Sequence, residues 1–340
     1  MRRLALAAVA ALLLLPDAAP AQIVDERDKI AQTGMKFLSV VADPRAAAMG
    51  SAATALEGGA EMLFSNPAGM ARLGGATDLM VGQTEWIAGI DYNHGALAIN
   101  AGNLGVVGVT LAFVDYGEFT ETIYADNEDG YLTLGTFSPQ AWSAGVGYAR
   151  ALSGQFSVGG QVKYAAEDLG ASLISYNPET GPGTEGDERQ ENTIGTLAYD
   201  FGVLYKTGFE SLNFAVSARN FSQEIELETE SFQLPLALHI GVSMDVLDLA
   251  ATSDLHSLVL AVDAENPRDF QEQIKIGGEY TFADAVSFRA GYVYPTDEQG
   301  IQLGAGFRQD VGGLGLGADY AYTDFGVFNN VHRVALRLSF

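Results

Sequence analysis

The 340-residue chain lacks cysteine, has few basic residues and contains no long hydrophobic run beyond its N-terminus. Without cysteine, disulfide bonds and thiolate metal sites are excluded. The chain holds 18 Lys and Arg against 43 Asp and Glu, a formal net charge of −25. Nucleic acid is not an expected partner, because neutralising phosphates needs basic patches. A membrane-spanning helix needs roughly 18 or more successive apolar residues, and none is expected here.

The sequence also lacks the motifs of an enzyme. The four histidines are scattered, and no two have the spacing of metal ligands. There is no nucleophile elbow, P-loop or dinucleotide fingerprint in a strand-turn-helix context, and Gly313-Leu314-Gly315 falls in a predicted strand or turn. We therefore expect no enzyme activity, no catalytic residue, no cofactor and no metal site.

The N-terminus has the three-part layout of a secretory signal peptide. Arg2 and Arg3 precede an apolar run from Leu4 to Leu15, and Ala19-Pro20-Ala21 offers a small-x-small cleavage site. The apolar run is too short for a spanning helix. We predict that residues 1–21 are a signal peptide, cleaved near Ala21.

Glycine, tyrosine and phenylalanine are abundant, with 40, 14 and 18 residues. Barrels place aromatics at the membrane interfaces and small residues on crowded inner walls. From Asp78 onward, segments of about ten residues, the length of a tilted membrane strand, alternate apolar and polar side chains. We predict an all-β fold over residues 78–340: a 14-stranded antiparallel transmembrane β-barrel with strands near 78–87, 91–100, 104–114, 141–150, 155–167, 195–206, 211–220, 236–247, 256–265, 272–282, 285–294, 301–309, 314–324 and 332–340.

The last predicted strand has one apolar and one basic face. Its apolar face carries Val334, Leu336, Leu338 and the final Phe340. This pattern resembles the terminal strand of bacterial outer-membrane barrels, where it acts as an insertion signal. The resemblance implies location in the bacterial outer membrane, with outer-membrane lipid and the barrel-insertion machinery as partners.

Linker lengths agree with a barrel, which has short turns at one end and long loops at the other. The three longest linkers, 115–140, 168–194 and 221–235, follow the third, fifth and seventh strands and are predicted to be outer loops. Their acidity fits solvated loops, and divalent ions bridging them to anionic lipid are the alternative. A soluble sandwich or propeller would show the same alternation, because periodicity does not say which face is outside.

Residues 22–77 do not have the alternation of barrel strands, and we predict that they form an N-terminal plug. Asp43 suits a helix N-cap with Pro44 at the first helical position. Residues 50–56 are nearly all small, which permits close backbone approach. The predicted plug motif comprises Asp43, Pro44, Arg45, Asn66, Pro67, Ala68 and Gly69.

Two stretches of this region, A-D-P-R-A-A-A-M-G-S-A-A-T-A and F-S-N-P-A-G-M-A-R-L, resemble the N-terminal region of the PorV/PorQ family. Those outer-membrane barrels are related in fold to the FadL family of fatty-acid transporters. The resemblance implies fourteen strands and a hatch that contains Asn66-Pro67-Ala68. It also implies either a role in type IX secretion, with exported cargo proteins or secretion-system components as partners, or FadL-like transport of hydrophobic small molecules.

Two plug residues each have two interpretations. Asn66 could position a ligand or gate, or it could be a turn residue that caps the hatch before Pro67. Arg45 could bridge the plug to acidic residues of the lumen, or it could be an exposed charge.

The alternation also predicts which charged residues face the lumen. Their signs are mixed, whereas an ion-selective pore has a lining of one sign. Pairing across the wall and to the plug is the first interpretation, and a transport path is the second. The predicted lumen-facing charges are Lys163, Asp200, Lys206, Arg219, Asp263, Lys275, Glu279, Arg289, Arg308, Asp319, Arg333 and Arg337.

Overall fold

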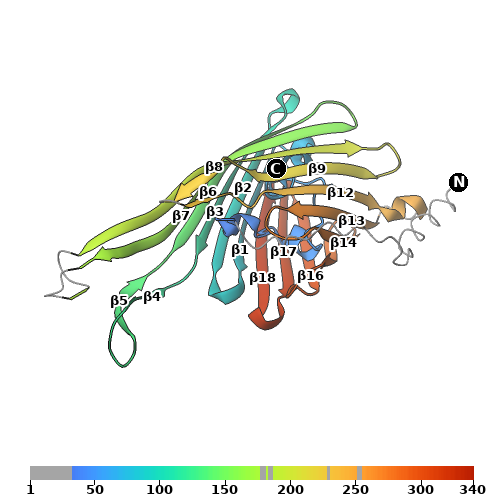
Figure 1. The fold of residues 1–340 in the computed structure, drawn as a ribbon. Helices are drawn as coiled ribbons and strands as arrows, with labels where there is room; N and C mark the ends of the chain where they lie inside the picture. The colour runs from blue at the N-terminus through green and yellow to red at the C-terminus, as the bar shows by residue number, and fades with distance from the viewer. Residues whose placement is uncertain (1–32, 177–180, 183–186, 228–229, 251–254) are drawn as a thin grey trace, which may run out of the picture.

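The computed structural model describes residues 33–176, 181–182, 187–227, 230–250 and 255–340. Its main body is a closed antiparallel barrel of fourteen strands (Figure 1), which confirms the predicted fold class. No helix in the described ranges is long and apolar enough to cross a membrane. In chain order, the barrel strands are β1 (Thr77–Glu85), β2 (Asp91–Asn100), β3 (Val106–Asp115), β6 (Gln140–Ala151), β7 (Phe156–Ser175), β8 (Glu188–Lys206), β9 (Asn213–Phe221), β12 (Ala237–Asp245), β13 (His256–Pro267), β14 (Gln273–Phe282), β15 (Val286–Tyr294), β16 (Gln302–Val311), β17 (Leu314–Asp324) and β18 (Asn330–Ser339).

The barrel closes where its first strand meets its last. β1 and β18 pair from Asp78 opposite Ser339 to Glu85 opposite His332. Next to the Asp78–Ser339 pair, the backbones of Thr77 and Phe340 exchange two hydrogen bonds of 2.7 and 3.0 Å. A closed ladder leaves no unpaired edge along this seam, as a strand in lipid requires.

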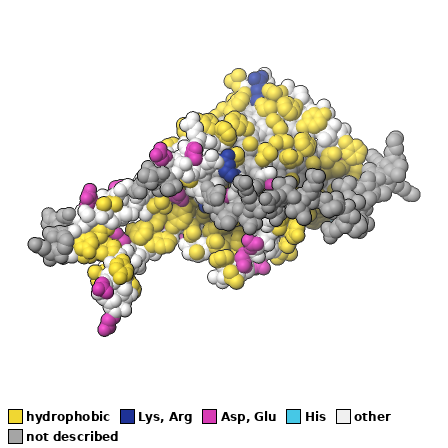
Figure 2. All heavy atoms as spheres, in the orientation of Figure 1, with side chains coloured by type: hydrophobic (Ala, Val, Ile, Leu, Met, Phe, Trp, Pro, Cys, Tyr) yellow, Lys and Arg dark blue, Asp and Glu magenta, His cyan; other side chains and the backbone are white. Residues whose placement is uncertain are grey.

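Side chains alternate along each strand between an apolar outer face and a polar or small inner face. In β18, Val334 and Leu336 are exposed on the outside, whereas Arg333 and Arg337 are buried. Figure 2 shows hydrophobic side chains over much of the visible barrel wall. An apolar surface of this extent on a closed barrel is the band that contacts lipid tails.

The three longest linkers are not plain loops, and here the sequence-based boundaries were wrong. β7 continues to Ser175 and β8 begins at Glu188, so most of 168–176 and 188–194 is strand. The linker after β3 contains the hairpin β4 (Phe119–Tyr124) and β5 (Tyr131–Phe137), and the linker after β9 contains β10 (Ile225–Leu227) and β11 (Glu230–Phe232). β4–β5 and β10–β11 form two-stranded sheets separate from the closed barrel, so the alternation expected of a barrel wall does not apply to them.

The links between strands differ in length at the two ends of the barrel. We call the end with these extended hairpins the long-loop end, and the other the short-turn end. The hairpins β4–β5 and β7–β8 project far from the barrel (Figure 1). Short 3-10 turns occur in other links: η4 (Ile87–Gly89), η5 (Gly102–Leu104), η6 (Val246–Ala250) and η7 (Gly326–Phe328).

Residues 33–76, the N-terminal segment, pack against the inner faces of strands all around the barrel. The segment contains η1 (Lys36–Ser39), α2 (Pro44–Ala48), η2 (Ala60–Phe64) and η3 (Pro67–Arg72). As predicted, Asp43 caps α2: its side chain accepts from the Ala46 N–H at 3.0 Å, with Pro44 at the first helical position. The predicted signal peptide and residues 22–32 lie outside the described residues.

Small residues allow the close fit of the N-terminal segment. Met49, Met62 and Met70 of this segment are fully buried against small inward residues such as Ala98 and Ala149. Burial of each such side chain contributes about 1.5–3 kcal/mol relative to exposure. Where backbones touch, even a methyl group is too large: a Cβ at Gly291 of β15 would overlap the backbone nitrogen of Gly50.

Candidate functional site

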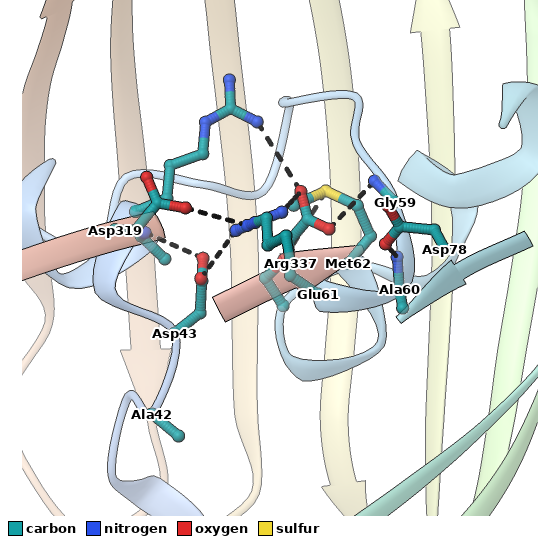
Figure 3. Close-up of polar contacts among 12 residues, drawn as sticks. Ala42, Asp43, Gly59, Ala60, Glu61, Met62, Asp78, Asp319 and Arg337 are labelled. Carbon is teal, nitrogen blue, oxygen red and sulfur yellow. Dashed lines mark hydrogen bonds and ion pairs between the residues drawn. The ribbon is translucent and has the colours of Figure 1, made fainter. Parts of the chain in front are cut away.

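The polar contacts between the N-terminal segment and the barrel centre on Arg337 of β18. Its guanidinium meets three carboxylates: Nη1 lies 2.6 Å from Glu61 Oε1, Nη2 lies 3.0 Å from Asp43 Oδ1, and Nε lies 2.9 Å from Asp319 Oδ2. Figure 3 shows Arg337 between these three acids. Asp43 and Glu61 come from the N-terminal segment and Asp319 from β17, so one side chain joins segment and wall.

Two further arginines extend this arrangement. Arg45 of α2 donates through Nη2 and Nε to the two carboxylate oxygens of Glu279, at 2.7 and 3.0 Å. Arg289 of β15 joins Glu279 to Asp319, with distances of 2.5 and 2.6 Å. Of the two interpretations of Arg45, the structure therefore has the bridge to the wall. We call the whole set the central ion network: Asp43, Arg45, Glu61, Glu279, Arg289, Asp319 and Arg337.

Burial makes the central ion network sensitive to the loss of any one charge. Burial by itself raises the pKa of Glu61, but the charges of Arg337 and Arg45 outweigh this effect and lower its pKa below the usual value. The carboxylate therefore stays ionised although its residue is only 1% exposed. Removing one partner of a buried ion pair leaves a charge without compensation, at a cost of about 3–5 kcal/mol.

Asn66 is a fully buried cap of η3. Its side-chain oxygen accepts from the Ala68 N–H at 3.1 Å, and its amide nitrogen donates to the carbonyls of Thr54 at 2.8 Å and Val203 at 3.2 Å. The described residues therefore use both ends of the amide for structure. This geometry supports the interpretation of Asn66 as a turn and cap residue. Pro67, Ala68 and Gly69, which complete the predicted motif, are also buried in η3.

Several other predicted inward charges meet carboxylates. Lys163 of β7 lies 2.7 Å from Asp200 of β8, and both are buried. Lys275 pairs with Glu265. Lys206 is half-buried and lies 2.7 Å from Glu57 of the N-terminal segment.

Four predicted inward charges form no ion pair with an opposite charge among the described residues. Asp263 accepts from the backbone N–H of Thr54 at 2.9 Å, which is a tie to the N-terminal segment without an ion pair. Arg333 donates to the Val41 carbonyl and the Thr323 hydroxyl, both at 2.8 Å. Arg308 is exposed, and it lines a cavity at the short-turn end. Arg219 is half-buried, and its Nε is buried without a hydrogen-bond partner in the described chain.

Sequence reasoning missed several residues of these contacts. Glu265 lies two residues after Asp263 in β13 and therefore on the same inward face, so the alternation could have identified it. Glu61 is a lone acid between small and apolar residues, which could have marked it as buried. Lys36 and Asp269 pair near the long-loop end, and no local signal predicts that contact because 232 residues separate them in the chain.

Two cavities lie toward opposite ends of the barrel. The larger, about 720 Å³, is at the short-turn end, where Arg72, Asp310 and Ser339 are among its lining. The smaller, about 160 Å³, is at the long-loop end, where Trp86, Asp269 and Gln299 are among its lining; we call it the long-loop cavity. The N-terminal segment contributes residues to both.

The projecting hairpins carry acidic and aromatic side chains. The linkers 115–140, 168–194 and 221–235 hold sixteen of the acidic residues and one basic residue, Arg189. Arg189 lies 3.1 Å from Glu121, which ties β8 to β4. Tyr124 and Tyr131 at the tip of the β4–β5 hairpin are 85% and 51% exposed. Acidic side chains are visible along the hairpins in Figure 2.

The predicted insertion-signal residues lie on the outer wall. Val334, Leu336 and Phe340 are exposed, and Leu338 is half-buried. These four side chains lie on the outer face of β18, next to the strand pair that β18 forms with β1. Among the described residues, no three His, Cys, Asp or Glu side chains group as a metal site requires.

The barrel is similar in fold to a solved toluene transporter and to a solved FadL homologue. The toluene transporter TodX of Pseudomonas putida matches with a TM-score of 0.54 and 12% identity, covering 87% of this chain and 96% of TodX. A FadL homologue of Pseudomonas aeruginosa matches with a TM-score of 0.52 and 12% identity, covering 88% of this chain and 97% of that one. At such identities the likeness concerns the fold. No curated protein matches the sequence.

A sequence family covers most of the barrel. Residues 131–337 match the family described as type IX secretion system membrane protein PorP/SprF. The stretches that resemble PorV/PorQ lie before this range, and the match does not confirm that narrower assignment. Because the match spans more than half of the sequence, the chain belongs to the PorP/SprF family of type IX secretion system membrane proteins.

Proposed function

We propose that this protein is a non-enzymatic outer-membrane barrel that serves type IX protein secretion or the surface attachment of exported proteins. Its partners are then secretion-system components or exported cargo. In this arrangement the long-loop end faces the cell exterior and the short-turn end faces the periplasm. A PorV/PorQ-like role is the narrower form of the proposal, and it rests on the sequence resemblance of residues 33–73.

The observation that carries the proposal is the pair of projecting hairpins at the long-loop end. Exposed aromatic side chains such as Tyr124 and Tyr131 are of the type enriched at protein–protein interfaces. The acidic surroundings favour encounter with a basic partner surface, since complementary charge raises association rates.

The N-terminal segment supports the same proposal. We infer that it acts as a plug, with the central ion network holding it in the barrel. Removing it to open a path would separate Arg45 from Glu279 and Asp43 from Arg337. Leaving such charges unpaired in a buried site is costly. A barrel locked in this way is better suited to holding a partner than to passing one through its lumen.

A second candidate function is FadL-like transport of hydrophobic small molecules, such as long-chain fatty acids or aromatic hydrocarbons. It is favoured by the fold shared with the toluene transporter TodX and by the hatch motif expected at Asn66-Pro67-Ala68. Under this proposal, the N-terminal segment would have to move during transport.

The two candidates are separated by a deletion strain. We expect the strain to lose exported proteins from its surface, and re-expression of the full chain to restore them. A variant with Tyr124→Ser and Tyr131→Ser should restore export poorly, whereas Tyr292→Ser and Tyr294→Ser, two exposed residues of β15, serve as the matched control. Unchanged export with reduced uptake of fatty acids or toluene would reject the first candidate and favour the second.

Processing and location follow from the same proposal. We propose that the chain reaches the outer membrane after cleavage near Ala21. Mass spectrometry of the mature N-terminus tests the cleavage site. Recovery of the protein from membranes by carbonate without detergent would contradict insertion of the barrel.

A further inference from the structure

The long-loop cavity has an excess of positive charge. Its lining includes Lys36, Arg219, Lys275 and Arg333, and its two carboxylates are Glu265 and Asp269. Both carboxylates are already engaged: Glu265 pairs with Lys275, and Asp269 pairs with Lys36. Arg219 and Arg333 therefore face the cavity without a carboxylate partner in the described chain.

Four side chains of this lining, those of Arg219, Asn220, His239 and Gln302, have a buried polar atom without a hydrogen-bond partner among the described residues. Gln302 is fully buried, and neither atom of its amide has a hydrogen-bond partner in the described chain. His239 is 6% exposed, and its Nε2 lies 3.7 Å from Glu265, too far for a hydrogen bond. Arg219 Nε is likewise buried without a partner among the described residues. Buried polar groups are nearly always satisfied by protein, water or a ligand, so this group needs an explanation.

The strands that carry Arg219, His239 and Lys275 are close neighbours: β9, β12 and β14. β12 lies beside β9 and is separated from β14 only by β13. In register, Arg219 lies opposite Ala237, two residues before His239, and His239 lies opposite Glu265. Arg219, His239 and Lys275 also line a second, smaller cavity deeper in the barrel. They therefore form one continuous polar patch on the inner wall.

We propose that the long-loop cavity binds a compact oxyanion, a carboxylate or phosphate group, with Arg219 as its main charge partner. Arg219 offers a forked guanidinium, which suits planar recognition of an oxyanion. Gln302 and His239 supply uncharged hydrogen-bonding groups that fix a polar ligand. At about 160 Å³, the cavity is smaller than the roughly 300 Å³ or more that a drug-sized ligand needs. Its ligand is therefore a compact group and not a long acyl chain.

Water is the competing occupant. Ordered waters would satisfy Gln302 and His239, but they would not neutralise the charge excess. Binding that depends on the charge of Arg219 therefore distinguishes an anion site from a hydrated cavity.

The chain carries a built-in reporter for this test. Of its two tryptophans, Trp86 lines the cavity and lies 5.4 Å from the Arg333 guanidinium, whereas Trp142 lies exposed on the outer wall. A Trp142→Phe background therefore reports on the cavity alone. The full-length protein in detergent is titrated with acetate and with inorganic phosphate, at ionic strength held constant with chloride.

We expect a saturable change of Trp86 fluorescence with at least one probe, and the probe that binds more tightly identifies carboxylate or phosphate as the ligand group. Arg219→Gln should weaken binding at least about tenfold, the scale of a lost charge-assisted hydrogen bond, and Arg219→Lys should retain part of it. Arg308→Gln, which changes an exposed barrel arginine outside this cavity, is the control and should leave binding unchanged.

Folding of each variant is checked by heat-modifiable mobility on gels, and Arg219→Lys keeps the test valid if Arg219→Gln does not fold. The absence of saturable response to both probes would overturn the proposal in favour of a hydrated cavity. An equal response in the Arg219→Gln variant would do the same. These outcomes are independent of the secretion assay, because the proposed site does not rest on the proposed function.

Discussion

The central ion network and the long-loop cavity both place charged side chains inside the barrel. They differ in whether those side chains are paired with opposite charges. In the central ion network, three arginines meet four carboxylates at short distances. In the long-loop cavity, Arg219 and Gln302 keep atoms without partners among the described residues. The first arrangement stabilises a fixed contact between segment and wall. The second is suited to an exchangeable ligand, because donors without a partner gain hydrogen bonds when a ligand binds.

The largest effect should come from breaking the central ion network. Arg337→Met leaves Asp43, Glu61 and Asp319 without their shared cation. We expect a loss of about 3–5 kcal/mol in the free energy of unfolding, because buried charges become unpaired. Urea unfolding in lipid or detergent measures it. Arg308→Met, on an exposed arginine, should change stability by less than about 0.5 kcal/mol, and equal losses in the two variants would contradict the network's role.

A second test addresses the close packing around the network. Gly291→Ala places a methyl group against the backbone of Met49 and Gly50. We expect a loss of about 1–3 kcal/mol, the usual range for overpacking, measured by the same unfolding experiment. Gly278→Ala on the adjacent strand is the matched control, since its nearest atom would lie 3.4 Å away in ordinary contact. A harmless Gly291→Ala would mean that the segment is not held tightly against β15.

The cap at Asn66 should have a smaller effect. Asn66→Ala removes the cap of η3 and the hydrogen bonds to the Thr54 and Val203 carbonyls. We expect a loss of about 1–2 kcal/mol, together with faster proteolysis of the N-terminal segment. Asn213→Ala, which removes a single 3.5 Å bond to the Ala55 carbonyl, should have less effect. If the two variants are equally stable, Asn66 has a different role.

The smallest effect should come from the long-loop cavity in the absence of anions. Gln302→Leu removes an amide that has no partner in the described chain. Replacing such a group costs little, so we expect stability to change by less than about 1 kcal/mol and in either direction. In contrast, acetate or phosphate binding should weaken. A large loss of stability without added anion would show that Gln302 is structural, and it would remove the contrast with the central ion network.

Much of the fold could be predicted because lipid imposes a pattern on each strand. A strand between lipid and lumen must alternate, and all fourteen predicted barrel segments overlap observed strands. The alternation rule no longer applies beyond the closed barrel at the long-loop end. The β4–β5 hairpin is a two-stranded sheet separate from the barrel, and β7 beyond Asp168 pairs with β8 but no longer with β6, so the alternation rule of the wall does not apply there.

The candidate site could be predicted only in part. Alternation points Arg289, Asp319 and Arg337 inward, and the structure buries all three. It does not say which of them meet. Glu61 reaches Arg337 across 276 positions of the chain, and nothing local specifies that distance. Glu61 was therefore absent from the predicted residues.

The sequence by itself determined the barrel, its strand number and the Asp43 cap, because each follows from local rules of alternation and hydrogen bonding. The tertiary structure decided which inward charges pair and which stay open. Closure of the barrel brings β18 beside β1, and the N-terminal segment packs against both β17 and β18. Arg337 therefore lies among three carboxylates, whereas Arg219 faces a cavity. Two arginines on similar alternating strands thus differ only through what the closed barrel places opposite them.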